Sequence, residues 1–350
     1  MTERFYKVAG LVFSVRLEEP WSFMNYTAAV AERIRVAAIG GLVPVMPTRA
    51  GDGEPPRTYV RSREELPDNY GGNVLDFSQY EPFATEECSD TLFGVTVCAG
   101  GPDEVANAHK NGEMEKIMSM TDVLPYYHVY RWRGGTVFEF EGEGGKIDGT
   151  LYVAQGAEKG QFWAGTHLRP YSVMFQLCFA LRIMYTYNAV RKNAALLHAS
   201  VILCNDVAVL FFGSSGTGKS THSRLWLENI PGAELLNDDN PVIRIEDGKV
   251  NVYGTPWSGK TPCYRNVTAP VCAFVRLSQA PENKVRKLSG LDSFTNIISS
   301  ASSIRWERGV MDGIMSVMSY SAMHVKCLYM ECLPNKEAAE ICYGETVKSM

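Results

Sequence analysis

Polar and apolar residues alternate with a period of two through much of the first half of the chain. This period is typical of strands that bury one face, and it runs through residues 4–17 and recurs in short runs between 91 and 165. Turns at Gly134-Gly135 and across residues 142–149 separate these runs at intervals that suit an antiparallel sheet. Residues 1–165 are therefore predicted to form a β-rich accessory domain, with a loop-rich stretch up to about residue 90.

The pattern changes in the second half of the chain. Residues 171–190 are largely apolar, and Gln176 and Arg182 among them favour a buried helix over a membrane span. Beyond this helix, short apolar runs alternate with helical segments, as in a mixed α/β domain. This second domain is predicted at residues 166–350.

Turn residues define the elements of the second domain. Asn205-Asp206 joins two apolar runs as a hairpin, Pro231-Gly232 ends a helix, and Glu246-Asp247-Gly248 closes a second hairpin. The predicted elements are strands at 196–204, 207–212, 233–236, 241–245 and 249–253, and a helix at 219–228.

Composition and charge narrow the range of partners. Hydrophobic residues make up 45% and charged residues 21% of the chain, which is typical of a globular protein with a sizeable core. Lys and Arg number 34 against 39 Asp and Glu, so the net charge of -5 provides no basic excess for a nucleic acid backbone. We expect neither nucleic acid nor a membrane as a partner.

Cysteine usage and the N-terminus favour a cytoplasmic protein. The nine cysteines are odd in number and follow no spaced framework, which favours a reducing compartment. His324, Cys327 and Cys332 lie in an alternating stretch that predicts a half-buried strand rather than a zinc site. The N-terminal residues alternate in polarity, whereas a secretory signal peptide needs a continuous apolar run.

The most specific motif is a complete phosphate-loop (Walker A) pattern, G-x-x-x-x-G-K-S/T, which starts at Gly213. It follows the predicted strand 207–212 and opens the predicted helix at 219, as a loop that cradles phosphates requires. Its glycines let successive N–H groups point at one anion, and the helix dipole adds positive potential there. The predicted nucleotide-binding residues are Gly213, Ser214, Ser215, Gly216, Thr217, Gly218, Lys219, Ser220 and Thr221.

Two side chains of the loop have predicted chemical roles. Lys219 is expected to reach the β and γ phosphates of a nucleotide, with ATP as the expected donor. The Ser220 hydroxyl is expected to coordinate Mg²⁺, whose other ligands are mostly water and phosphate oxygens. His222 points away from the phosphates by helical spacing and is interpreted as a packing residue.

Carboxylates and a histidine are expected close to the loop. Asp238 and Asp239 follow the strand at 233–236, where one can bind the metal and the other can accept a proton from an attacking hydroxyl. His198 lies on the first strand of the hairpin whose second strand leads into the loop. Antiparallel pairing therefore predicts that His198 approaches Gly213.

The irregular segment 254–260, with the sequence GTPWSGK, is typical of a loop that contacts a ligand. Trp257 is a candidate for packing against a base or substrate, and Lys260 and Arg265 are candidates for contacts to phosphate or to an acidic substrate. A turn with solvated charges is an equally good interpretation of each of these residues.

The ordered segments LLHAS, GSSGTGKST, LLNDDNPVIRI and YGTPWSGK resemble the HPr kinase/phosphorylase family and its relatives with the phosphoenolpyruvate-carboxykinase-like fold. The resemblance covers about residues 193–280, and the C-terminal segment VKCLYMECLPNKEAAEIC resembles the final strand and helix of these proteins. It implies phosphoryl transfer to a hydroxyl, in a mixed sheet with helices packed on it. It also implies catalytic roles for His198 and Lys219, Asp239 as the proton acceptor, and Ser220 and Asp238 on the metal side.

The chain also departs from that family. The glycine-rich signature with a metal-binding glutamate is not visible after Asp239, where YGTPWSGK stands instead, and residues 1–165 do not resemble the family's regulatory domain. HPr is therefore not supported as the substrate. The chain looks more like the diverse related kinases of bacteria, some of which act on free serine or on peptides.

Together these patterns predict Mg²⁺-dependent phosphoryl transfer from a nucleotide to a hydroxyl of a small molecule or of a serine in a peptide or protein. The alternative is a nucleotide-binding regulatory or scaffold protein without turnover. The metal-side serine and the Asp-Asp pair favour the enzyme, because a pure binder needs no proton acceptor. Monomer and homo-oligomer are both compatible with the sequence.

Overall fold

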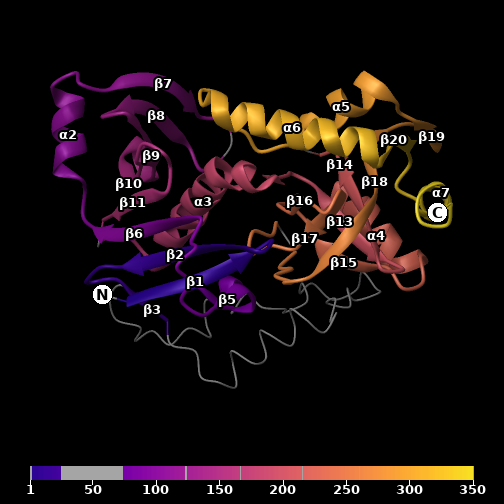
Figure 1. The fold of residues 1–350 in the computed structure, drawn as a ribbon, viewed down its shortest axis with the longest axis horizontal. Helices are drawn as coiled ribbons and strands as arrows, with labels where there is room; N and C mark the ends of the chain where they lie inside the picture. The colour runs from indigo at the N-terminus through magenta and orange to yellow at the C-terminus, as the bar shows by residue number, and fades with distance from the viewer. Residues whose placement is uncertain are drawn as a thin grey trace. The chain divides into compact units, whose positions relative to one another are not determined.

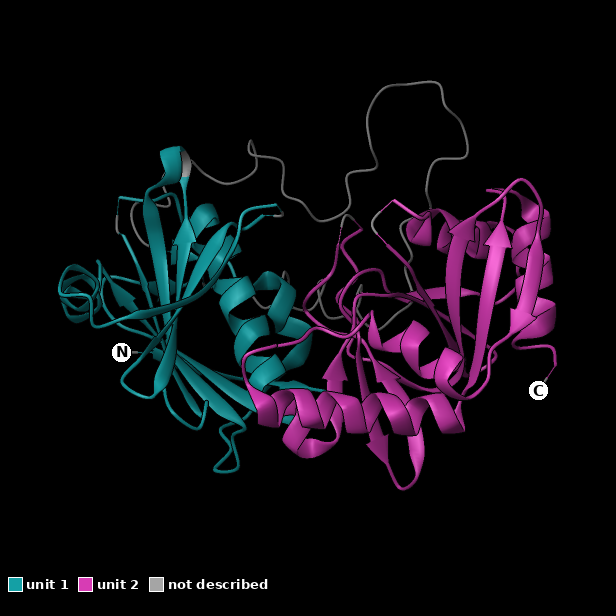
Figure 2. Cartoon of the chain, turned by 90° about the horizontal axis from the view of Figure 1, so that it is seen from above, with its two compact units in different colours: residues 1–31, 66–188 teal, residues 32–65, 189–350 magenta. Residues whose placement is uncertain are grey.

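The computed structural model describes residues 2–24, 74–122, 124–165, 167–214, 216–259 and 261–349. These residues form a mixed α/β protein with two compact units, which Figure 2 shows in different colours. Of the described residues, those up to Asn188 belong to the first unit and those from Ala189 onward to the second. Most of the loop-rich stretch expected before residue 90 lies outside the described residues.

The first unit is built on a sheet with the order β5-β1-β2-β6-β11-β10-β9-β8-β7 (Figure 1). Its strands are β1 (Thr2–Val8), β2 (Leu11–Leu17), β5 (Ala84–Thr85), β6 (Phe93–Ala99), β7 (Glu115–Met120), β8 (Tyr127–Trp132), β9 (Gly135–Glu141), β10 (Ile147–Val153) and β11 (Lys159–Ala164). A short pair, β3 (Ser22–Phe23) and β4 (Val74–Leu75), and the 3-10 helices η1 (Ser78–Phe83) and η2 (Glu143–Gly145) lie in the same part of the chain.

The sheet of the first unit is mixed rather than purely antiparallel. β6 runs parallel to both of its neighbours, β2 and β11, so the expectation of an antiparallel sheet is wrong at this strand. Parallel neighbours need a long connection that returns the chain to the same end of the sheet. The chain between β6 and β11 is long enough, and it contains α2 (Asp103–Lys110).

Residues 4–17 belong to a hairpin rather than to the single strand that their alternation predicts. β1 and β2 pair along their full length, with Val8 opposite Leu11 next to the turn. Ala9 and Gly10 have φ values of 52° and 74°, the left-handed conformation that a tight hairpin turn needs. The alternation continues on both sides of this turn, so the pattern does not reveal it.

The long apolar helix predicted at 171–190 is α3 (Pro170–Ala189). It packs on the sheet of the first unit, where the Tyr185 hydroxyl donates to the carbonyl oxygen of Val8 at 3.1 Å. The division between the two units therefore falls after Asn188 rather than after residue 165. Within the described ranges, no helix has the length and apolar character needed to span a membrane.

The second unit contains a sheet with the order β12-β16-β17-β18-β14-β13-β15, and β20 pairs with both β18 and β19. Its strands are β12 (Ala194–Leu196), β13 (Ser200–Cys204), β14 (Val207–Phe212), β15 (Glu234–Asn237), β16 (Val242–Glu246), β17 (Lys249–Tyr253), β18 (Thr268–Gln279), β19 (Lys284–Lys287) and β20 (Lys326–Cys332). Its helices are η3 (Val190–Lys192), α4 (Lys219–Asn229), α5 (Gly290–Ile298), α6 (Arg308–His324) and α7 (Lys336–Glu345). Figure 1 shows α4 and α7 on one side of this sheet and α5 and α6 on the other.

Three neighbouring strands bring separate chain segments to one edge of this sheet. β13 runs antiparallel to both β14 and β15, which therefore run in the same direction. The end of β14, the end of β15 and the start of β13 consequently lie at the same edge. The phosphate loop, the Asp238-Asp239 pair and the residues just before Ser200 meet at this edge.

Apolar packing and a buried polar contact fix α4 on the sheet. Trp226 of α4, Phe211 of β14 and Ala338 of α7 belong to one core cluster of buried residues. The buried side chains of Ser200 on β13 and Ser223 on α4 share a hydrogen bond of 2.6 Å. This packing gives the start of α4 a defined position relative to the sheet edge.

His222 is a packing residue, in agreement with its predicted role. Its side chain is 2% exposed, and its ring packs edge-on against Phe211 with centroids 4.8 Å apart. Its Nε2 accepts a hydrogen bond from Trp226 Nε1 at 3.2 Å, so Nε2 carries no proton. Burial lowers the pKa of His222 to about 4.

This burial predicts a pH-dependent stability. Between pH 6.5 and about 4 the unfolded chain binds a proton on His222 that the folded chain does not, so stability is complete above 6.5 and falls as the pH drops through this window. The loss approaches about 3 kcal/mol. Urea unfolding at pH 7 and pH 4.5 measures it, and His222→Gln, which keeps an acceptor for Trp226 but does not titrate, should lose less stability. Equal losses in both proteins would contradict the prediction.

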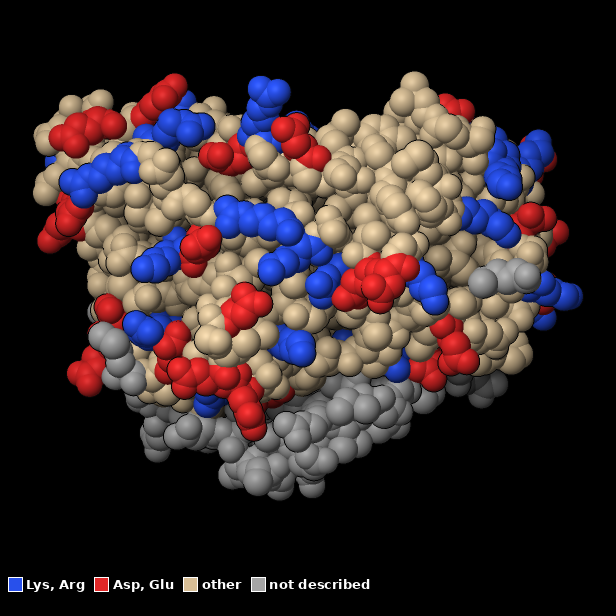
Figure 3. Space-filling model, in the orientation of Figure 1, with Lys and Arg blue, Asp and Glu red and all other residues tan. Residues whose placement is uncertain are grey.

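Basic and acidic side chains are interspersed on the surface. Figure 3 shows Lys and Arg beside Asp and Glu over the face in view, without a large area of a single sign. This arrangement matches the near balance of 34 basic and 39 acidic residues in the sequence.

Candidate active site

The glycine-rich loop predicted to bind phosphate follows β14 directly, and its described glycines have the backbone conformations that the motif predicts. Gly216 and Gly218 have φ values of 81° and 100°, which side chains rarely adopt. A Cβ added to either would meet nothing within 4 Å, so conformation rather than crowding requires glycine there. At Gly213 crowding requires glycine, because a Cβ would lie 2.6 Å from the Thr217 hydroxyl oxygen.

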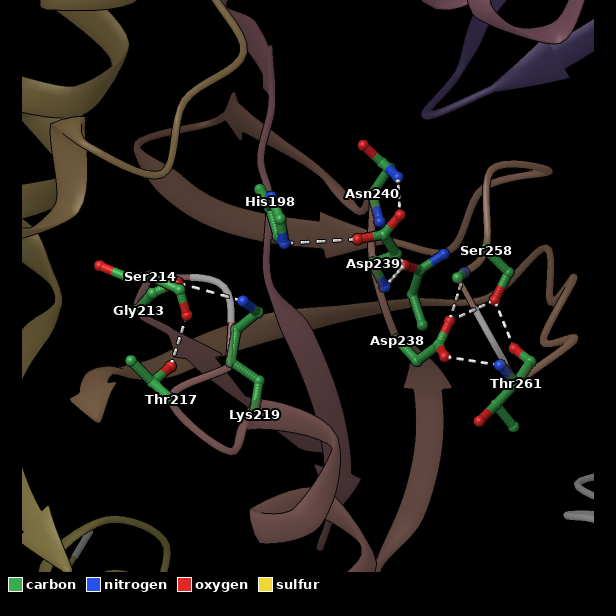
Figure 4. A network of polar contacts seen from close by, with 12 residues as sticks. His198, Gly213, Ser214, Thr217, Lys219, Asp238, Asp239, Asn240, Ser258 and Thr261 are labelled. Carbon is green, nitrogen blue, oxygen red and sulfur yellow. Dashed lines mark hydrogen bonds and ion pairs between the residues drawn. The ribbon is translucent and has the colours of Figure 1, made fainter. Parts of the chain in front are cut away.

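Hydrogen bonds to backbone carbonyl groups connect the described residues of the loop (Figure 4). The Thr217 hydroxyl donates to the Ser214 carbonyl at 2.8 Å, and Gln279 Nε2, at the end of β18, donates to the Gly216 carbonyl at 2.9 Å. Lys219 Nζ donates to the Gly213 carbonyl at 3.1 Å. Ser215 lies outside the described residues.

The loop presents a partly buried cation and an exposed hydroxyl at the start of α4. Lys219 is 9% exposed, and burial lowers the pKa of its amine while the negative charge of Asp239 acts in the opposite direction. A cation withdrawn from water in this way gains most from a bound anion. Ser220 is exposed and Thr221 half-buried in the first turn of the helix.

Asp239 and His198 meet beside the loop. His198 Nε2 lies 3.5 Å from Asp239 Oδ1, and the Asn240 side-chain amide donates to Asp239 Oδ2 at 2.6 Å (Figure 4). The side chains of His198 and Asp239 are 53% and 31% exposed, so both remain accessible. The backbone also joins the two segments, because Ala199 N donates to the Asp239 carbonyl at 3.0 Å.

His198 lies in the short irregular segment between two strands rather than within a strand. Residues 196–204 are not one strand, because β12 pairs with β16 whereas β13 pairs with β14, and His198 lies between them. Ser200 pairs with Phe211, so the residues before Ser200 still lie beside the start of the loop. The sequence predicted the correct edge of the sheet for His198, but it wrongly predicted that His198 lies within a strand.

Asp238 faces a different segment from its neighbour. Its side chain is buried, and its Oδ1 accepts from the Ser258 hydroxyl at 2.5 Å and from Gly259 N at 2.7 Å. Its Oδ2 accepts from Thr261 N at 2.9 Å. Because both oxygens have partners inside the protein, this carboxylate does not fit the metal-side role expected for it.

Asn237 shapes the turn that carries both aspartates. Its Oδ1 accepts hydrogen bonds from the backbone N–H groups of Asp239 and Asn240, both at 2.9 Å. Its Nδ2 donates to the hydroxyl of Thr255 at 3.2 Å. Sequence reasoning did not single out Asn237, although an asparagine that ends a strand before two aspartates is a signal for a side-chain-to-backbone turn.

Of the three residues proposed as substrate contacts, the two that the structure describes, Trp257 and Arg265, are buried. Trp257 is 3% exposed and Arg265 is 7% exposed. Arg265 donates to the Leu235 carbonyl at 2.7 Å and to the Glu234 carboxylate at 2.8 Å, so its charge is engaged inside the protein. Burial therefore argues against ligand contacts for Trp257 and Arg265. Lys260 lies outside the described residues.

The described residues of the site thus combine groups suited to anion binding and to proton transfer, without a preformed group of metal ligands. Within the described part of the chain, no three His, Cys, Asp or Glu side chains are grouped to bind a metal ion. Mg²⁺ bound with a nucleotide does not need such a group, because phosphate oxygens and water fill most of its shell. The exposed Ser220 hydroxyl fits one of the remaining positions.

Comparisons with known proteins give little beyond this geometry. No protein-family model matches the chain, and no curated protein sequence matches it. Among solved structures, the Hpr(Ser) kinase/phosphatase from Coxiella burnetii matches with a TM-score of 0.27 and 13% identity, over 42% of this chain and 85% of that one. Similarity of this size does not define a shared fold.

Proposed function

We propose that the chain transfers the terminal phosphoryl group of a nucleoside triphosphate, with ATP as the expected donor, to a hydroxyl group. One observation carries the proposal: three neighbouring strands bring the loop with Lys219, the carboxylate of Asp239 and the imidazole of His198 to one edge of one sheet. A phosphate cradle next to an accessible carboxylate is what transfer to a hydroxyl requires. A binder without turnover has no use for the carboxylate.

The reaction assigns one role to each group. The acceptor oxygen forms a bond to the γ phosphorus, the bond from that phosphorus to the β-γ bridging oxygen breaks, and the hydroxyl proton passes to Asp239. Lys219 offsets the negative charge that collects on the phosphate oxygens. His198, 3.5 Å from Asp239, orients this carboxylate.

In the proposed reaction, Mg²⁺ would be bound at the start of α4. The Ser220 hydroxyl would hold it, and the buried Asp238 would not, because its oxygens accept three hydrogen bonds from residues 258–261. When bound, the ion neutralises charge on the phosphates.

The test is direct transfer. Purified protein is incubated with Mg²⁺ and γ-labelled ATP, together with serine, small alcohols or a cell extract, and labelled products are separated. Transfer of label to an acceptor, or release of phosphate to water, supports the proposal. Tight ATP binding without either product would favour the regulatory or scaffold alternative.

His198→Ala should lower turnover by about tenfold, or about 1.4 kcal/mol of barrier, since His198 acts through Asp239. Its side chain is 53% exposed, so the change removes little buried surface and should shift the melting temperature only slightly. ATP turnover and thermal unfolding, measured on the same preparation, test the expected loss of turnover and the expected small change in stability. A large loss of stability with unchanged turnover would instead make His198 a structural residue.

A further inference from the structure

The two adjacent aspartates have different surroundings. Asp239 is accessible beside His198, whereas Asp238 is 7% exposed and accepts three hydrogen bonds from residues 258–261. Figure 4 shows the carboxylate of Asp238 turned toward Ser258 and Thr261, and that of Asp239 turned toward His198. A buried carboxylate is stabilised when several donors satisfy it, and the donors to Asp238 come from a single short segment.

A second set of bonds joins the same two segments. The Thr255 hydroxyl donates to the Asn240 carbonyl at 2.7 Å, and Asn237 Nδ2 donates to the same hydroxyl at 3.2 Å. The Ser258 hydroxyl also accepts from Cys263 N at 3.2 Å. The turn that carries Asp239 is therefore hydrogen-bonded to Thr255, Ser258, Gly259 and Thr261.

Gly259 shows how closely the segments approach. A Cβ added there would lie 3.0 Å from Asp239 Cβ, and 3.3 and 3.4 Å from the two Asp238 oxygens. Its backbone has no left-handed φ, so close approach rather than conformation accounts for glycine at this position. Gly259 therefore lies in close contact with both aspartates.

We propose that Asp238 is a positioning residue: it holds Ser258, Gly259 and Thr261 against Asp239, so that Asp239 keeps its orientation. The catalytic importance of this orientation rests on the proposed function. The contact that Asp238 maintains between Asp239 and this segment, the Asp238 clamp, is a property of the fold. A misplacement of about 1 Å at a reacting group costs about a hundredfold in rate, which is the scale of effect expected.

Asp238→Asn tests the clamp. The amide replaces one acceptor oxygen with a donor, so at least one of the three N–H or O–H groups loses its partner. Hydrogen exchange of the peptide containing Gly259 and Thr261 should become at least about tenfold faster, and ATP hydrolysis per bound nucleotide should fall by about a hundredfold. The ATP dissociation constant should stay within about twofold. Asp206→Asn, in the exposed turn between β13 and β14, is the matched control and should change none of these values.

Gly259→Ala provides a second test without removing a charge. The methyl group should displace Asp239 and lower hydrolysis per bound nucleotide by about tenfold, again with unchanged ATP affinity. Gly309→Ala, where an added Cβ meets nothing within 4 Å, is its control. Simple loss of folded protein would reduce the number of nucleotide sites but not the turnover of each site.

The outcomes separate the inference from the proposed function. Unchanged exchange in Asp238→Asn, or normal turnover per site in Asp238→Asn and Gly259→Ala, overturns the clamp. If the wild-type protein binds ATP but neither hydrolyses nor transfers it, the proposed function fails, while faster exchange in Asp238→Asn would still support the clamp.

Discussion

Asp239→Asn should lower phosphoryl transfer by about 10²- to 10⁴-fold, the usual contribution of a general base. The amide cannot take the proton of the acceptor hydroxyl, although it can keep the contacts to His198 and Asn240. Nucleotide should still bind, and its affinity should rise slightly because a negative charge near the phosphates is removed. Single-turnover transfer from γ-labelled ATP and calorimetric binding measure the two effects.

Asp247→Asn is the control for the loss of charge. Asp247 lies in the exposed turn between β16 and β17, so its replacement removes the same charge and should leave transfer unchanged. Wild-type transfer by Asp239→Asn would rule out the mechanism proposed for this site. Nucleotide binding without base catalysis would then be the better description of the protein.

Lys219→Ala should weaken ATP binding by about a hundredfold or more. The amine is partly buried at the start of α4, and removing one partner of a desolvated charge pair costs about 2–5 kcal/mol. Calorimetry at constant Mg²⁺ measures the affinity, with circular dichroism to check the fold. Lys249→Ala, at an exposed position on β17, removes the same charge and should bind ATP normally. Unchanged affinity in Lys219→Ala would mean that the glycine-rich segment is only a structural turn.

Local signals predicted the second unit well. The strand expected at 207–212 is β14, and the helix expected at 219–228 is α4 with one residue added. Asn205 and Asp206 both have positive φ, as the two-residue hairpin requires. In these cases neighbouring residues in the sequence determine the structure, so a single sequence is enough.

Contacts between distant segments could not be predicted in the same way. The break at His198 arises because β12 and β13 pair with different strands, and no residue near it signals the change. Asp238 accepts hydrogen bonds from donors 20 or more residues away, in a segment without a regular period. Arg265 was interpreted as a ligand contact because an arginine in an irregular segment is usually solvated, but it pairs with Glu234 on β15. Burial and pairing of this kind depend on the assembled sheet.

β13, the antiparallel strand between β14 and β15, fixes the distance between the ends of these two strands. Neighbouring strands are spaced by their backbone hydrogen bonds, so the end of the strand that leads into the phosphate loop and the end of the strand before Asp239 stand roughly 9–10 Å apart. Side-chain substitutions cannot change this span, because the backbone sets it. Under the proposed function, acceptors of different size would therefore have to fit beside this span rather than widen it, and a redesign of acceptor choice should leave the three strands untouched.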